Sequence, residues 1–124
     1  MKFPLFFLFA FSFLFPLKAE LAIYEFDAKW CDPCKVLTAE LNMDEDAQKD
    51  IRKYRGFLKL DVDKFPNLAT KWGVTTIPQY LIVEVSEAPD GTRAKVIDRW
   101  TPPNGDRLES LKKFIKEGLT KGTE

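Results

Sequence analysis

The residues best suited to chemistry in this chain are two cysteines, Cys31 and Cys34, separated by Asp32 and Pro33. They follow a short apolar run and precede a segment with helical periodicity, so we expect them in the first turn of a helix. The free N–H groups and partial positive charge at a helix amino end stabilise a thiolate, which is the form that attacks disulfides. Pro33 suits this turn because its missing N–H has no partner to lose there. The spacing predicts thiol–disulfide exchange, with Cys31 as the exposed nucleophile and Cys34 as the buried resolving partner.

Two other uses of a cysteine pair stay open at this level. Such a pair can form half of a zinc site, but zinc takes about four ligands, and the chain has only two cysteines and no histidine. A zinc or iron–sulfur site shared between two copies would supply the missing ligands. The pair can also be an inert structural disulfide, although so short a loop constrains the unfolded chain weakly. We expect no resident metal and no cofactor.

The absence of histidine removes several mechanisms together. Without an imidazole, the chain can form neither a Ser-His nor a Cys-His nucleophile, and it has no imidazole general base. The net charge is zero, and the charged residues are interspersed. This pattern lacks the basic footprint of a nucleic-acid-binding protein, so we expect no nucleic-acid partner.

Strand-like and helical patterns alternate along the chain, in the order β-α-β-α-β-β-α. Strand–helix–strand units imply parallel pairing, and the turn residues at 89–91 add an antiparallel fourth strand. The sequence therefore predicts an α/β fold with a central four-stranded mixed sheet covered by helices. The expected strands are Leu21–Phe26, Phe57–Val62, Gln79–Val85 and Ala94–Trp100. The first expected helix, Cys34–Leu41, is interrupted at 42–44, and a second helical segment follows at Asp44–Tyr54. The remaining expected helices are Phe65–Trp72 and Leu108–Leu119.

Glu25 is the singular residue of the first predicted strand, which is otherwise apolar on both faces. Strands of that kind usually lie in the middle of a sheet. An acid buried there is costly to ionise, so we expect its pKa to be raised. The alternative is an edge strand whose acid faces water.

The first nineteen residues form a separate unit. Seven of the eleven phenylalanines lie in the first fifteen residues, after Lys2 and before Ala19. A charged start, a short apolar run and a small residue predict a signal peptide at 1–19, followed by one domain at 20–124. An uncleaved membrane anchor is the alternative. We therefore expect an exported protein, periplasmic or secreted.

Three motifs carry a resemblance to a known family. They are Trp30-Cys31-Asp32-Pro33-Cys34-Lys35, Lys59-Leu60-Asp61-Val62-Asp63 and Trp72-Gly73-Val74-Thr75-Thr76-Ile77-Pro78. Together they resemble thioredoxins over residues 21–119, and in particular exported thioredoxin-like proteins. The chain departs from full thioredoxins by lacking their first strand and helix, so the resemblance implies an abbreviated thioredoxin fold.

The resemblance also implies roles around the cysteine pair. Glu25 matches the buried acid that accepts the proton of the inner cysteine, and Lys59 matches a lysine that sits near that acid and can tune it. A plain surface lysine is the other interpretation of Lys59. Pro78 matches a cis proline that faces the cysteines and leaves the Ile77 backbone free to pair with an extended substrate. Trp30 is expected to shield the site and to contact substrate.

The resemblance implies a protein-disulfide reductase that needs no cofactor and acts as a monomer. The carboxylate of Asp32 disfavours a thiolate on Cys31, and this tilts the expectation toward reduction. Disulfide-containing client proteins, among them apocytochrome c, are implied as partners, with a membrane thiol-reductant transporter as electron donor. A disulfide oxidase or isomerase is the alternative within the same chemistry, and a non-catalytic adaptor or chaperone is the alternative outside it.

Overall fold

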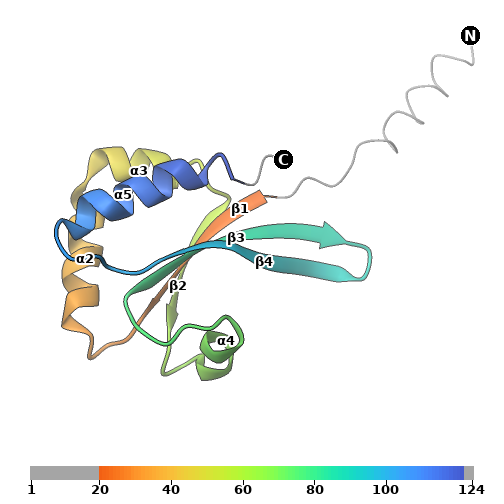
Figure 1. Ribbon diagram of the computed structural model, residues 1–124. Helices are drawn as coiled ribbons and strands as arrows, with labels where there is room; N and C mark the ends of the chain where they lie inside the picture. Colours follow the sequence, from red (N-terminus) through yellow and green to blue (C-terminus); the bar gives the residue numbers. More distant parts are fainter. Residues whose placement is uncertain (1–19, 122–124) are drawn as a thin grey trace, which may run out of the picture.

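A computed structural model describes residues 20–121, so the predicted signal peptide at 1–19 lies outside the described part. These residues form one sheet with helices on both faces (Figure 1). The predicted α/β fold, with its four-stranded mixed sheet, is confirmed. In chain order the elements are β1 (Glu20–Asp27), α2 (Asp32–Met43), α3 (Glu45–Ile51), β2 (Gly56–Asp61), α4 (Pro66–Lys71), β3 (Gln79–Ala88), β4 (Gly91–Trp100) and α5 (Arg107–Gly118).

Strand β1 is internal, as its two apolar faces predict. The strand order is β2-β1-β3-β4, so β1 has a neighbour on each side. It pairs with β2 in parallel and with β3 in antiparallel orientation. Ile23 and Phe26 point to opposite faces, and both are fully buried. The edge-strand alternative for Glu25 is therefore wrong.

The direction of β3 differs from the parallel pairing expected for consecutive strand–helix–strand units. Strand β3 is antiparallel to β1, and Gln79 at its start pairs with Phe26 near the end of β1. The connecting helix α4 has 6 residues, about 9 Å of rise, whereas the 6 residues of β2 extend about 20 Å. So short a helix does not return the chain to the far end of the sheet, and β3 starts at the end where β2 finished.

The helices divide into two layers that make two cores. Helices α2, α3 and α5 cover one face, where Leu37, Leu41, Leu111 and Ile115 pack on Ile23 of β1. Helix α4 covers the other face (Figure 1), with Ala69 against a cluster of side chains that alternate with the first set along the strands. None of the helices within residues 20–121 is long and apolar enough to cross a membrane.

Asp44 produces the interruption predicted at 42–44. Its side chain accepts a hydrogen bond from the Ala47 N–H at 2.9 Å and so caps the amino end of α3. The carboxylate also pairs with Lys112 of α5 at 3.0 Å. The Ala47 N–H, followed by Lys112, lowers the pKa of Asp44. One short polar side chain therefore both separates α2 from α3 and ties them to α5.

Candidate active site

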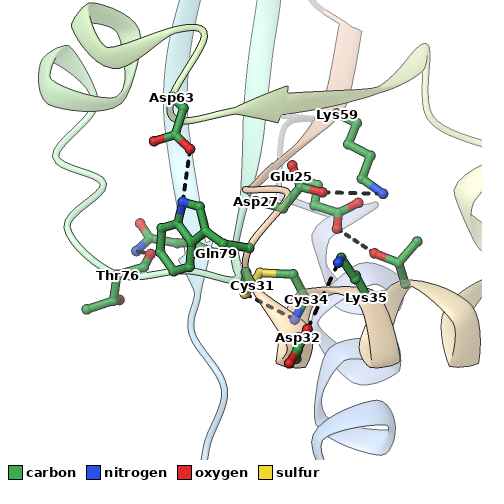
Figure 2. Close-up of a disulfide and its surroundings, with 12 residues drawn as sticks. Glu25, Asp27, Cys31, Asp32, Cys34, Lys35, Lys59, Asp63, Thr76 and Gln79 are labelled. Carbon is green, nitrogen blue, oxygen red and sulfur yellow. Dashed lines mark hydrogen bonds and ion pairs between the residues drawn. A yellow bond between two sulfur atoms is a disulfide. The ribbon is translucent and has the colours of Figure 1, made fainter.

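The two cysteines lie at the amino end of α2, where they are joined in a disulfide (Figure 2). Cys31 is the N-cap residue, and its Sγ accepts a hydrogen bond from the Cys34 N–H at 3.2 Å. Pro33 lies in the first turn, as expected from its missing N–H. The backbone therefore places a donor on the sulfur that the sequence marks as the nucleophile.

The expectation that Cys31 is exposed is wrong for the bonded pair. Cys31 is 4% exposed and Cys34 is 1% exposed. Ala28, Val62 and Ile77 pack around the two sulfurs. The reason is that these apolar side chains, together with Cys34, cover Cys31 in the oxidised protein.

Asp32 extends away from the disulfide into water (Figure 2), with 90% of its side chain exposed. Its carboxylate is 4.0 Å from the Lys35 ammonium. Water and this nearby cation both weaken the repulsion that the carboxylate exerts on a thiolate at Cys31. The Asp32 carboxylate is therefore still expected to disfavour a thiolate at Cys31, but the effect acts through solvent.

A tryptophan and a proline loop flank the disulfide. Trp30 is 66% exposed, and its indole N–H donates to Asp63 at 2.9 Å, so the ring is held in place although it faces water. The Ile77–Pro78 peptide bond is cis. Ile77 packs against the two cysteines. The surface beside the sulfurs is therefore formed by one exposed ring and one apolar loop.

The proline loop is anchored from behind by Arg99 of β4. Its guanidinium donates to the buried Gln79 side chain at 2.6 Å and to the Trp72 and Gly73 carbonyls at 2.7 and 3.3 Å. The Gln79 amide in turn donates to the Thr76 carbonyl at 3.2 Å. A chain of hydrogen bonds thus runs from the edge strand to the segment that contacts the disulfide.

Glu25 lies in the core layer beneath α2 and is 1% exposed. The Thr38 hydroxyl donates to its Oε2 at 2.8 Å. Thr38 follows Cys34 by one helical turn, so both face the same side of the helix, and the carboxyl lies under the turn that carries the resolving cysteine. Burial raises the pKa of Glu25, while the Thr38 hydroxyl opposes that rise less strongly.

Lys59 is the direct neighbour of Glu25 in the register of β1 and β2. Its ammonium, however, pairs with Asp27 at 3.3 Å (Figure 2). The positive charge of Lys59 lowers the pKa of Glu25, and the negative charge of Asp27 raises it by a smaller amount. Lys59 therefore forms its ion pair with Asp27, and its charge acts on the Glu25 carboxyl only electrostatically.

Residues 20–121 contain no cluster of three or more histidine, cysteine, aspartate or glutamate side chains that would hold a metal ion. The sulfurs of Cys31 and Cys34 are bonded to each other. In this bonded state the two sulfurs are the oxidised form of a dithiol pair.

Comparison with known proteins settles the family. The family model described as Thioredoxin matches residues 12–99. The chain belongs to the thioredoxin family. It is 31% identical over 90 residues to Thioredoxin H2 of Arabidopsis thaliana, covering 73% of this chain and 59% of that protein. It is 32% identical over 75 residues to a thioredoxin of Rickettsia bellii, covering 60% of this chain and 69% of that protein.

Solved thioredoxins share the fold. The structure from Fasciola hepatica has a TM-score of 0.58 at 29% identity and covers 82% of this chain and 83% of its own. The structure from Thermus thermophilus has a TM-score of 0.66 at 14% identity, with coverage of 84% and 77%. Family membership and the bonded cysteine pair support the predicted enzyme class, a thiol–disulfide oxidoreductase. The roles assigned to individual site residues stay predictions.

Sequence reasoning missed several residues that shape the site. Thr38 bonds the buried acid, Asp63 holds the exposed tryptophan and Asp27 takes the ion pair of Lys59. Gln79 and Arg99 hold the proline loop. Asp63 lies within the motif Lys59–Asp63 and Asp27 closes the first strand, but no local pattern connects Arg99 to Gln79, which lies 20 residues earlier.

Replacing Glu25 with glutamine is expected to stabilise the oxidised protein at neutral pH. The unfolded chain ionises Glu25 near 4.5, whereas the folded chain holds its proton to higher pH. Ionisation therefore favours the unfolded chain at every pH above about 4.5, and glutamine removes this effect while still accepting the Thr38 hydroxyl. Urea unfolding should show a gain that is absent near pH 3.5 and grows toward pH 7.5. The exposed Glu40 of α2 provides the control as Glu40→Gln, and an equal gain for both variants would contradict the prediction.

Proposed function

We propose that this protein is a thiol–disulfide oxidoreductase that reduces disulfides of exported proteins through Cys31 and Cys34. One observation carries the proposal: the Cys34 N–H donates to the Cys31 Sγ at the amino end of α2. When the disulfide is reduced, a thiolate formed at Cys31 meets a hydrogen-bond donor that is already in place. The favourable end of the helix dipole acts on the same atom.

The reduction proceeds in two exchange steps. The Cys31 thiolate attacks one sulfur of a client disulfide, a Cys31–client bond forms, and the other client sulfur leaves as a thiolate. Glu25 accepts the proton of Cys34. The Cys34 thiolate then attacks the Cys31 sulfur, the second client thiolate leaves, and the Cys31–Cys34 disulfide forms. Two electrons have passed from the dithiol to the client.

The client is proposed to dock along the surface beside the sulfurs. Trp30 offers an exposed ring whose position is set by Asp63. Ile77, half-buried, offers an apolar contact and a backbone held through Thr76, Gln79 and Arg99. An extended client segment would place its disulfide over Cys31 while its backbone follows Ile77.

The direction and location of the reaction belong to the same proposal. The Asp32 carboxylate disfavours a Cys31 thiolate and so disfavours the reduced form, which makes the pair a better reductant. The apolar start of the chain supports export. In an oxidising compartment the Cys31–Cys34 disulfide must be reduced to the dithiol again after each cycle. We propose a membrane thiol-reductant transporter as the source of electrons and secreted thiol proteins, such as apocytochrome c, as clients.

The reduction potential of the Cys31–Cys34 pair tests this function. Equilibration of the protein with dithiol redox buffers, followed by trapping of free thiols, is expected to give a potential near that of thioredoxin, about −270 mV. The dithiol form should reduce insulin. Asp32→Asn should move the potential upward, because it removes a charge that opposes the thiolate. A potential near that of a strong oxidant, about −120 mV, would refute the reductase assignment.

A further inference from the structure

A row of side chains crosses the sheet at the level of the buried acid. Lys59 of β2, Glu25 of β1 and Tyr80 of β3 are direct neighbours in the strand register. Glu25 and Tyr80 share the core layer under α2, where Tyr80 is fully buried. Thr38 reaches the same carboxyl from α2. Glu25 therefore accepts the Thr38 hydroxyl and has Tyr80 as its neighbour in the same buried layer.

The Tyr80 hydroxyl is an unusual group to find in this core. It is buried, and within the described part of the chain it has no hydrogen-bond partner. The Tyr80 ring packs edge-on against Phe57 and Trp100, a contact that phenylalanine would make equally well. A buried hydroxyl without a partner lowers stability, so packing does not explain why this position is tyrosine. Tyr80 lies directly opposite Glu25 in the register of β1 and β3, and its side chain occupies the core layer that Glu25 shares under α2.

The charged groups near Glu25 act on its pKa in opposite directions, so hydrogen bonds from hydroxyl groups have an important influence on that pKa. The charged groups that act on its carboxyl are Lys59 from β2 and Asp27 from β1, which have opposite sign and pair with each other at 3.3 Å. No charged side chain from α2 or β3 is among the groups that shift the acid. A buried carboxylate is stabilised chiefly by opposite charges and by hydrogen bonds to its charged form. The effects of the paired ions on Glu25 partly cancel, and the Thr38 hydroxyl supplies a direct donor.

We propose that Thr38 and Tyr80 are positioning residues for Glu25 as the proton acceptor of Cys34. Thr38 holds the carboxyl beneath the turn of α2 that carries Cys34. The Tyr80 hydroxyl donates to the carboxylate when Glu25 is ionised, the state from which it takes the Cys34 proton. Transfer of that proton leaves a neutral Glu25 and a Cys34 thiolate, which attacks the Cys31 sulfur. This inference rests on the proposed function.

The test compares Thr38→Val and Tyr80→Phe with the native protein. Each variant removes one hydroxyl and preserves the shape of the side chain. Both are expected to move the titration of Glu25, followed by infrared or carbon NMR of its labelled carboxyl, to higher pH. Thr38→Ser should restore the native titration. Tyr24→Phe is the matched control, because Tyr24 packs with Trp72 on the opposite face of the sheet.

The kinetic readout is the release of client from the Cys31–client mixed disulfide as a function of pH. We expect its acid limb to move upward with the Glu25 titration and release at lower pH to slow by up to roughly tenfold, since a general base contributes about 10²–10⁴-fold in all. Attack by Cys31 should keep its rate. Unchanged Glu25 titrations in folded Thr38→Val and Tyr80→Phe proteins would overturn the proposal. That measurement needs no client, so failure of the proposed reductase function would be seen separately, as loss of insulin reduction by the native protein.

Discussion

Cys31→Ser is expected to abolish disulfide reduction, whereas Cys34→Ser is expected to stop the reaction half-way, with the client attached to Cys31. The two sulfurs differ in position although they are bonded to each other. Cys31 caps α2, and its sulfur accepts a hydrogen bond from the Cys34 N–H. Cys34 lies within the first turn of α2 and is 1% exposed. Cys31 lies at the helix tip with a backbone donor on its sulfur, so we expect Cys31 to begin the exchange once the pair is reduced.

Two measurements distinguish these outcomes. Insulin reduction in the presence of dithiothreitol should fall to the rate of the reagent alone for both single variants. Non-reducing electrophoresis and mass spectrometry after mixing with a disulfide client should show a covalent adduct for Cys34→Ser and none for Cys31→Ser. An adduct of equal yield from both variants would mean that the two sulfurs are equivalent nucleophiles. Insulin reduction by Cys31→Ser at the native rate would exclude the exchange mechanism itself.

Gly118→Ala is expected to destabilise the fold, although alanine is the better helix former. Gly118 lies in the last turn of α5, and a methyl group there would collide with Ile82 and would come within 2.5 Å of the Tyr54 hydroxyl. Ile82 is fully buried in the sheet, and Tyr54 donates its hydroxyl to the Ile115 carbonyl at 2.5 Å. Overpacking of this kind costs about 1–3 kcal/mol, more than the roughly 0.5–1 kcal/mol by which alanine favours a helix over glycine.

Gly56→Ala provides the matched control. Gly56 begins β2, and a methyl group added there meets nothing within 4 Å. Thermal unfolding should show a lower Tm for Gly118→Ala, by about 4–8 °C for each kcal/mol lost in a domain of this size. Gly56→Ala should stay close to the native Tm. A Gly118→Ala protein as stable as the native one would show that α5 does not approach β3 as closely as the structure places it.

Much of the architecture follows from local patterns in the sequence. The apolar character of β1 on both faces predicted an internal strand, because a strand of that kind needs packing partners above and below the sheet. The helix after the cysteines, the break at Asp44 and the hairpin between β3 and β4 were predicted from periodicity, capping and turn residues. Element boundaries differ from the predicted ones by at most three residues, as expected when ends are set by hydrogen bonds rather than by composition.

Local patterns carried no information on contacts between distant elements. The antiparallel direction of β3 depends on the length of α4 relative to the strand it follows, and the ion pair of Lys59 with Asp27 depends on the register of two strands. The hydrogen bonds of Thr38 to Glu25 and of Arg99 to Gln79 join residues 13 and 20 positions apart. Such bonds form only after the sheet order is set, so no spacing along the chain encodes them.

The cysteine pair shows both what the sequence determines and what the tertiary structure decides. By itself the sequence determined a Cys-x-x-Cys pair at the start of a helix, after an internal strand that carries one buried acid, because helix caps and strand burial are written in neighbouring residues. Only the tertiary structure decided that the bonded Cys31 is 4% exposed, that the Thr38 hydroxyl bonds the acid and that Tyr80 is its neighbour in the buried layer. The physical reason is that exposure and hydrogen bonding depend on which surfaces meet, and α2, β1 and β3 meet only in the folded chain.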